Sequence, residues 1–178
     1  YTSVTIVSNS TVEYNPSFNM TVPDPGVGVN YGNLLLSNSG NRAFNAAMTI
    51  AGNLTASGTV ALAMNAGITV NGTLELGSGT SMDAKAYSHT LKGNFTNNGT
   101  FTPSTSTVTF GGTAAQAITG GATSFYNVVF NNSAGVTTSV DLSVSGNFTN
   151  TAGFGAGSTT TTFNGTAAQT ITATVATT

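Results

Sequence analysis

The stretch "TVTFGGTAAQAITG" (107–120) returns almost unchanged as "TTTFNGTAAQTITA" (160–173), 53 residues further along the chain. The shorter phrase "GNFTN" at 93–97 also recurs 53 residues later, at 146–150. A looser match at an offset of 94 relates "YGNLLLSNS", which starts at Tyr31, to "FYNVVFNNS", which starts at Phe125. Repeats that share one register predict structural units stacked on one another.

Local patterning identifies these units as strands. Polar and apolar residues alternate in "TVTF", "LSVSGNF" and "TLELG", which is the signature of a half-buried strand. Gly, Thr, Asn and Ser are abundant and are poor helix formers. We therefore expect an all-β protein.

A tight step at Gly or Asn divides the chain into smaller units of 14 to 21 residues. These anchors are Asn38, Gly52, Gly72, Gly93, Gly112, Asn132, Gly146 and Gly165. Two residues before each anchor the residue is large and apolar: Leu36, Ile50, Val70, Leu91, Phe110, Phe130, Val144 and Phe163. Three residues before, Thr occupies five positions: Thr49, Thr69, Thr90, Thr109 and Thr162. This pattern predicts apolar columns facing inward, with Phe110 and Phe163 in the same column, and Thr columns facing outward.

The fold predicted by these columns is a parallel β-helix, or β-solenoid, with a right-handed path and about nine or ten coils. An antiparallel sandwich would have no reason to keep the same columns over eight units. The solenoid is expected to cover residues 31–178. Residues 1–30 lack the pattern and hold Pro16, Pro23 and Pro25, so they are expected to form an N-terminal cap or an exchanged arm.

The stretches "VNGTLELGSGT" (70–80), "LKGNFTNNGTFT" (91–102) and "TVTFGGTAAQAITG" carry a family resemblance. They resemble the β-helical repeats of bacterial secreted and cell-surface proteins, including adhesins and autotransporter passengers. The resemblance covers about residues 31–178. It implies a stalk, a fibre or a display surface more than a particular activity.

Composition narrows the function further. Charged residues make up only 4% of the chain, against about a quarter in an average protein, and the net charge is −2. With only three Lys and Arg residues, binding to nucleic acid is not expected. No apolar run approaches the length of about 18 residues that spans a membrane. The chain has no cysteine and begins at Tyr1. A surface of Thr, Ser and Asn favours an extracellular or cell-surface location after removal of a leader peptide.

The few ionisable side chains offer little chemistry. Five lie close in sequence: Glu75, Asp83, Lys85, His89 and Lys92. Glu75 and Asp83 on adjacent coils could form the carboxylate pair of a carbohydrate-active enzyme. A solvated charged patch is the preferred interpretation, and a hydrogen-bonded core histidine is preferred for His89. We expect no catalytic residues, no metal and no cofactor, because acidic residues do not recur at the coil spacing and no phosphate loop or dinucleotide fingerprint is present.

Several Asn-x-Ser/Thr sequons allow glycosylation in a suitable host. The candidate sites are Asn53, Asn71, Asn94, Asn98 and Asn147. Because Thr and Ser are so common, some sequons are expected by chance.

The last residues, "AAQTITATVATT", read as a strand without the charge or proline that usually protects a solenoid end. A second copy could cover that edge, with the segment "YTSVTIV" adding a strand to its neighbour. The residues expected in such an assembly are Tyr1, Val4, Ile6, Ile171, Ala173 and Val175. The sequence therefore predicts a non-catalytic fibre subunit whose partners are copies of itself, head to tail. The alternative is an adhesin segment that binds glycans or a host surface.

Overall fold

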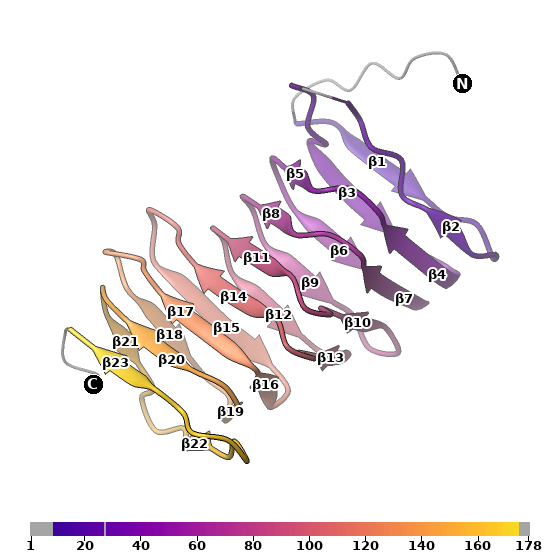
Figure 1. Ribbon diagram of the computed structural model, residues 1–178. Helices are drawn as coiled ribbons and strands as arrows, with labels where there is room; N and C mark the ends of the chain where they lie inside the picture. Colours follow the sequence, from indigo (N-terminus) through magenta and orange to yellow (C-terminus); the bar gives the residue numbers. More distant parts are fainter. Residues whose placement is uncertain (1–8, 27, 175–178) are drawn as a thin grey trace.

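The computed structural model describes residues 9–26 and 28–174, and Figure 1 shows them as a stack of short strands. Within these residues there are 23 strands and no helix, and hence no helix that could cross a membrane. Every strand pair is parallel, for example β1 (Thr11–Tyr14) with β3 (Asn33–Leu36). The chain is a parallel β-solenoid, as the column pattern predicts.

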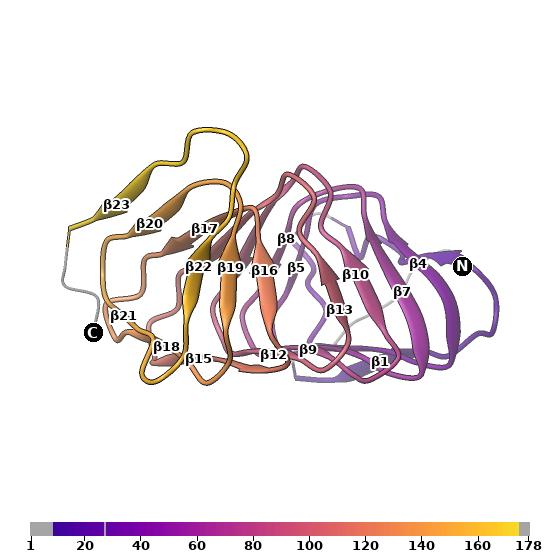
Figure 2. The ribbon, with the colours of Figure 1, turned by 90° about the horizontal axis from the view of Figure 1, so that it is seen from below.

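The strands form three faces around one core. Face A is an eight-stranded sheet of β1, β3, β6 (Leu54–Ala56), β9 (Leu74–Leu76), β12 (Phe95–Asn97), β15 (Gln116–Gly120), β18 (Val136–Thr138) and β21 (Phe154–Gly155). Face B joins a five-stranded sheet, β2 (Met20–Thr21), β4 (Ser39–Phe44), β7 (Thr59–Met64), β10 (Ser81–Asp83) and β13 (Thr100–Thr102), to a three-stranded sheet, β16 (Thr123–Phe125), β19 (Leu142–Val144) and β22 (Thr161–Phe163). Face C holds β5 (Met48–Ile50), β8 (Ile68–Val70), β11 (Ser88–Leu91), β14 (Thr107–Phe110), β17 (Asn127–Phe130), β20 (Phe148–Asn150) and β23 (Ile171–Ala173). Figure 2 shows the face B strands β4 to β22 in one row.

The chain passes from face A to face B to face C in each turn and then returns to face A one level higher. Leu34 pairs with Leu54, and Leu54 pairs with Leu74, so a regular turn advances by 20 residues. Face A contains eight strands, so the described residues make eight turns rather than the nine or ten predicted. The prediction counted each anchor step as one turn, but a 14-residue step covers only two of the three faces.

Counting each anchor step as a full turn also assigns the first and last residues of the predicted core column to the wrong face. Ile50, Val70, Leu91, Phe110 and Phe130 do stack in register on face C. In contrast, Leu36 lies on face A, and Val144 and Phe163 lie on face B. Phe110 and Phe163 are therefore not in one column, because 53 residues correspond to two and two-thirds turns. Each repeated phrase moves to the neighbouring face: "GNFTN" leads into β12 on face A and then into β20 on face C.

The outward threonine column is confirmed on face C. Thr49, Thr69, Thr90 and Thr109 pair in register. The column continues through Val129, Thr149 and Thr172, whereas the predicted member Thr162 lies on face B. β-Branched Thr fits an exposed, pleated surface of this kind.

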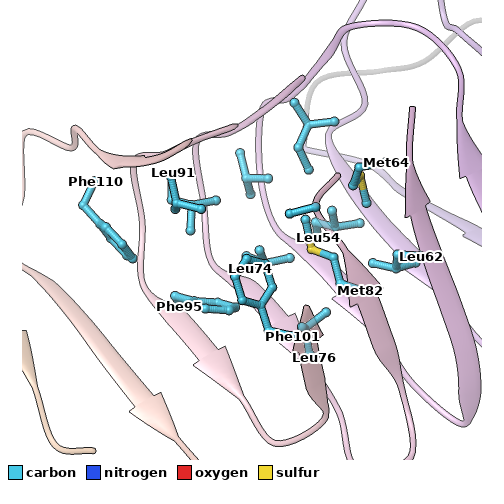
Figure 3. Packing of buried hydrophobic residues seen from close by; sticks show 14 of the residues in the cluster. Leu54, Leu62, Met64, Leu74, Leu76, Met82, Leu91, Phe95, Phe101 and Phe110 are labelled. Atoms are coloured by element: carbon cyan, nitrogen blue, oxygen red, sulfur yellow. The ribbon is translucent and has the colours of Figure 1, made fainter. Parts of the chain in front are cut away.

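The core is one continuous apolar column system along the rod. Leu and Met fill its first half, where Leu62, Met64 and Leu74 are buried, and Phe dominates the second half. Figure 3 shows the transition from Leu54 and Leu62 to Phe95 and Phe110. Further on, Phe130 stacks on Phe154 with ring centroids 4.4 Å apart. Burying each such side chain contributes about 1.5–3 kcal/mol, so stability is spread over the whole rod.

The first turn lies within residues 11–31. β1 pairs with β3, β2 pairs with β4, and Tyr31 bridges to Ile50 on face C. Regular stacking thus begins inside the segment that the sequence assigns to a cap or arm.

Candidate functional site

The last described turn leaves apolar side chains exposed at one end of the rod, although Phe148 and Phe154 stay buried. β21, β22 and β23 end faces A, B and C, and Figure 1 shows β22 and β23 at the C-terminal end of the stack. Phe163 contacts Phe148 edge to face at 5.5 Å, yet its own side chain is 39% exposed. Ile171 is 56% exposed. We call the surface formed by Phe163, Ile171 and Ala173 the end patch.

Two of the predicted assembly residues belong to this patch. Ile171 and Ala173 lie in β23, where they pair with Phe148 and Asn150 of β20, and both are exposed. Phe163 was not among the predicted residues, because its column was assigned to the core. The other predicted assembly residues, Tyr1, Val4, Ile6 and Val175, lie outside the described residues.

The opposite end of the described rod is stabilised by polar contacts within its first turn. The Tyr31 hydroxyl donates to the Pro23 carbonyl oxygen at 2.6 Å and lies 3.0 Å from the Tyr14 hydroxyl. Burial, followed by the contact with Tyr14, raises the pKa of Tyr31 well above its ordinary value, so its hydroxyl stays protonated. These bonds tie the proline-containing loop to the first turn.

Arg42 forms the largest set of side-chain hydrogen bonds at this end, and the sequence pattern did not identify it. It occupies an inward position on face B, between Met20 and Leu62, and is fully buried. Its guanidinium donates to five backbone carbonyl oxygens, those of Pro16, Phe18, Ser37, Ser39 and Asn41. A charged residue at an inward position of the strand alternation is the signal that could have identified it.

The five clustered ionisable residues do not form one site. Glu75 lies on face A in β9, and Asp83 ends β10 on face B, so the two carboxylates share a turn but not a face. Lys85 follows at the corner between faces B and C and pairs with Asp83 at 2.6 Å. His89 points inward from face C, and Lys92 is exposed at the next corner. The carboxylate pair expected of a glycosidase would need both acids on one surface.

His89 is a hydrogen-bonded core histidine, as preferred from the sequence. It is 1% exposed, and its Nδ1 accepts a long 3.4 Å bond from the Ile68 amide. Its Nε2 lies 2.9 Å from the Ala84 carbonyl oxygen and therefore carries the proton. Burial lowers the pKa of His89, although the bond to Ala84 opposes this effect. The ring is neutral and has a structural role.

The repeated phrase "GTAAQ" forms a corner between two faces, and its glutamine side chain holds that corner by hydrogen bonds to the backbone. Gln116 accepts from the Gly112 amide at 2.9 Å and donates to the carbonyl oxygens of Leu91 and Gly93 in the turn before. Gln169 repeats all three bonds one face away. At both corners the backbones of successive turns approach each other closely. The glutamine forms hydrogen bonds to backbone amide and carbonyl groups that the strand ladders leave unpaired.

Asparagine side chains also hold corners between faces, and several of these asparagines belong to the Asn-x-Ser/Thr sequons. The Oδ1 atoms of Asn53, Asn94 and Asn147 accept amide protons from Thr73, Ala117 and Thr170 in the following turn. All five predicted glycosylation sites are exposed, namely Asn53, Asn71, Asn94, Asn98 and Asn147. Glycosylation stays a prediction, and three of these asparagines have a structural role as well.

The described residues contain no cluster of metal-ligating side chains. No group of three or more His, Asp or Glu side chains lies close enough there to hold a metal ion. No protein-family model matches the sequence, and neither a curated protein nor a solved structure matches the chain.

Proposed function

We propose that this protein is a non-catalytic structural subunit that assembles end to end into an extracellular fibre. The observation that carries the proposal is the end patch, where Phe163 and Ile171 are exposed beside strand edges of all three faces. Parallel strands at an open edge present unpaired amide and carbonyl groups to another chain. A second solenoid placed below would continue both the hydrogen-bond ladders and the apolar core.

The two ends of the rod differ, which favours a polymer over a closed dimer. The first turn is tied down by Arg42 and by the Tyr14 and Tyr31 hydroxyls, whereas the end patch is apolar. A head-to-tail contact joins unlike surfaces and leaves one of each free, so it propagates. β1 and β2 offer the matching edges of faces A and B.

Composition supports an extracellular or cell-surface location. The rod has outward columns of Thr and Asn and very few charges. Exposed hydroxyl and amide groups keep such a surface hydrated without a net charge. We propose no catalysis, because Glu75 and Asp83 lie on different faces.

The proposal is tested by sedimentation velocity and negative-stain electron microscopy of purified protein over a range of concentrations. The parent chain is expected to form unbranched filaments above a threshold concentration. Phe163→Asp and Ile171→Asp place charges in the end patch and should leave single rods. Tyr87→Asp is the matched control, since Tyr87 is 40% exposed but lies in the middle of the rod.

Two results would contradict the proposal. One is a parent chain that stays a single rod at high concentration. The other is a loss of filaments in Tyr87→Asp equal to that in the end-patch variants.

A further inference from the structure

A hollow of about 380 Å³ lies at the corner between faces B and C. It is lined by exposed residues from three successive turns: Asn65, Lys85, Ala86, Tyr87, Ser104 and Thr105. Its volume falls within the range of roughly 300–1,000 Å³ that is typical of small-ligand sites. Tyr87 is the one large aromatic side chain in the lining, and it is 40% exposed.

The backbone around the hollow has an unusual conformation. Lys85 and Ser104 both adopt positive φ, at 54° and 47°. Residues other than Gly seldom occupy this region, and such strain is concentrated at binding and active sites. Here it shapes the two stacked loops that form the walls.

The walls are also held rigidly. The Asp83 carboxylate accepts from the Lys85 amide at 3.0 Å and from the Ser104 hydroxyl at 2.8 Å. The Thr105 amide donates to the Lys85 carbonyl oxygen at 3.1 Å, which ties one loop to the other. A preorganised wall reduces the ordering cost of binding a ligand.

Lys85 is the one charged residue that lines the hollow, and its charge is paired with a neighbouring carboxylate. The Lys85 ammonium contacts the Asp83 carboxylate at 2.6 Å. An anionic ligand would have to compete with that carboxylate, and a cation would have to compete with the lysine. The remaining polar groups are the neutral hydroxyls of Ser104 and Thr105 and the Asn65 amide, whose Nδ2 donates to Asn45.

We propose that this hollow binds a neutral pyranose unit of an extracellular polysaccharide. A pyranose ring has a face of C–H groups and a rim of hydroxyls. The Tyr87 ring, whose face carries negative charge density, would pack against the C–H face. Ser104, Thr105, Asn65 and the Lys85–Asp83 pair would bond to the hydroxyl rim. The site lies at mid-rod, away from the end patch, so it is independent of assembly and would let each subunit of a fibre hold a glycan.

Saturation-transfer NMR with the full chain tests the proposal, because it observes the ligand and works for single rods and filaments alike. The probes are neutral hexasaccharides of glucose, xylose, mannose and N-acetylglucosamine, with an oligogalacturonate as the charged comparison. At least one neutral probe should bind. Tyr87→Ala should weaken its affinity about tenfold, which corresponds to about 1.4 kcal/mol of ring contact. Tyr87→Phe keeps the ring and should change affinity by less than about threefold, since the proposed contact is made by the face of the ring and not by the hydroxyl.

Tyr126 provides the matched control. In the strand register it stands at the same corner as Tyr87, two turns further along, and it does not line the hollow. Tyr126→Ala should leave the affinity unchanged. The proposal is overturned if no neutral probe binds, if the charged probe binds and the neutral probes do not, or if Tyr126→Ala weakens binding as much as Tyr87→Ala.

Discussion

Replacing Gln116 by Met tests whether the repeated phrase acts through its glutamine. Met has a similar volume and flexibility but cannot form the hydrogen bonds. Gln116 is 2% exposed and forms four side-chain bonds, which join Gly112, Leu91, Gly93 and Asn132 across three turns. Gln169→Met removes the same device from a partly exposed corner, so the chain contains its own control.

The expected magnitudes follow from burial. A hydrogen bond contributes about 1 kcal/mol net, and a buried group left without a partner costs about 1–3 kcal/mol. Gln116→Met removes four bonds at a buried corner and should lower the free energy of unfolding by roughly 3–5 kcal/mol. Gln169→Met removes three bonds where water can replace them, so a loss of roughly 1–2 kcal/mol is expected.

Urea unfolding followed by circular dichroism measures both losses, and unchanged m-values would show that the same structure unfolds. A loss of less than about 1 kcal/mol in Gln116→Met would contradict the role given to its hydrogen bonds. Equal losses in the two variants would contradict it as well, since burial would then have no influence on the cost.

Three further predictions concern other buried or constrained residues. Because burial lowers the pKa of His89, the unfolded chain binds a proton more readily than the folded one. The free energy of unfolding should therefore fall as pH drops from 7 through about 6.5, and urea titrations of His89→Gln should lack that slope. Arg42→Lys cannot satisfy five carbonyl oxygens and should lower stability by about 2–4 kcal/mol in the same assay, and a loss below about 0.5 kcal/mol would contradict the role given to the guanidinium. Gly58 and Gly135 both have positive φ, but a Cβ at Gly58 would collide with the Asn38 carbonyl whereas one at Gly135 meets nothing within 4 Å; thermal unfolding should show a loss of about 1–2 kcal/mol for Gly135→Ala and a clearly larger one for Gly58→Ala.

The fold class could be predicted because the inward positions of successive solenoid turns recur at a regular spacing in the sequence. Ile50, Val70, Leu91 and Phe110 are about one turn apart, so their common register is visible in the spacing. The number of turns could not be predicted in the same way. All three corners use the same Gly and Asn chemistry, so a step of two faces, as from Asn132 to Gly146, resembles a full turn.

The candidate sites were only partly predictable. Ile171 and Ala173 stand at the end of the strand pattern and were found from it. Phe163 was missed because apolar residues in the last turn resemble those in the core. The hollow was also missed: Asp83 and Lys85 are close in sequence, but Ser104 comes from the next turn, and only the stacking of loops brings it to the same wall.

Helical reconstruction of the filaments by cryo-electron microscopy tests the central claim most directly. The eight described turns at about 4.8 Å each span about 38 Å, so the axial rise per subunit should be at least that long if the strand ladders continue from one chain to the next. We predict such a rise, with Phe163 and Ile171 buried at each junction. Side-by-side packing of rods, a rise shorter than the described turns, or the absence of filaments would contradict the account.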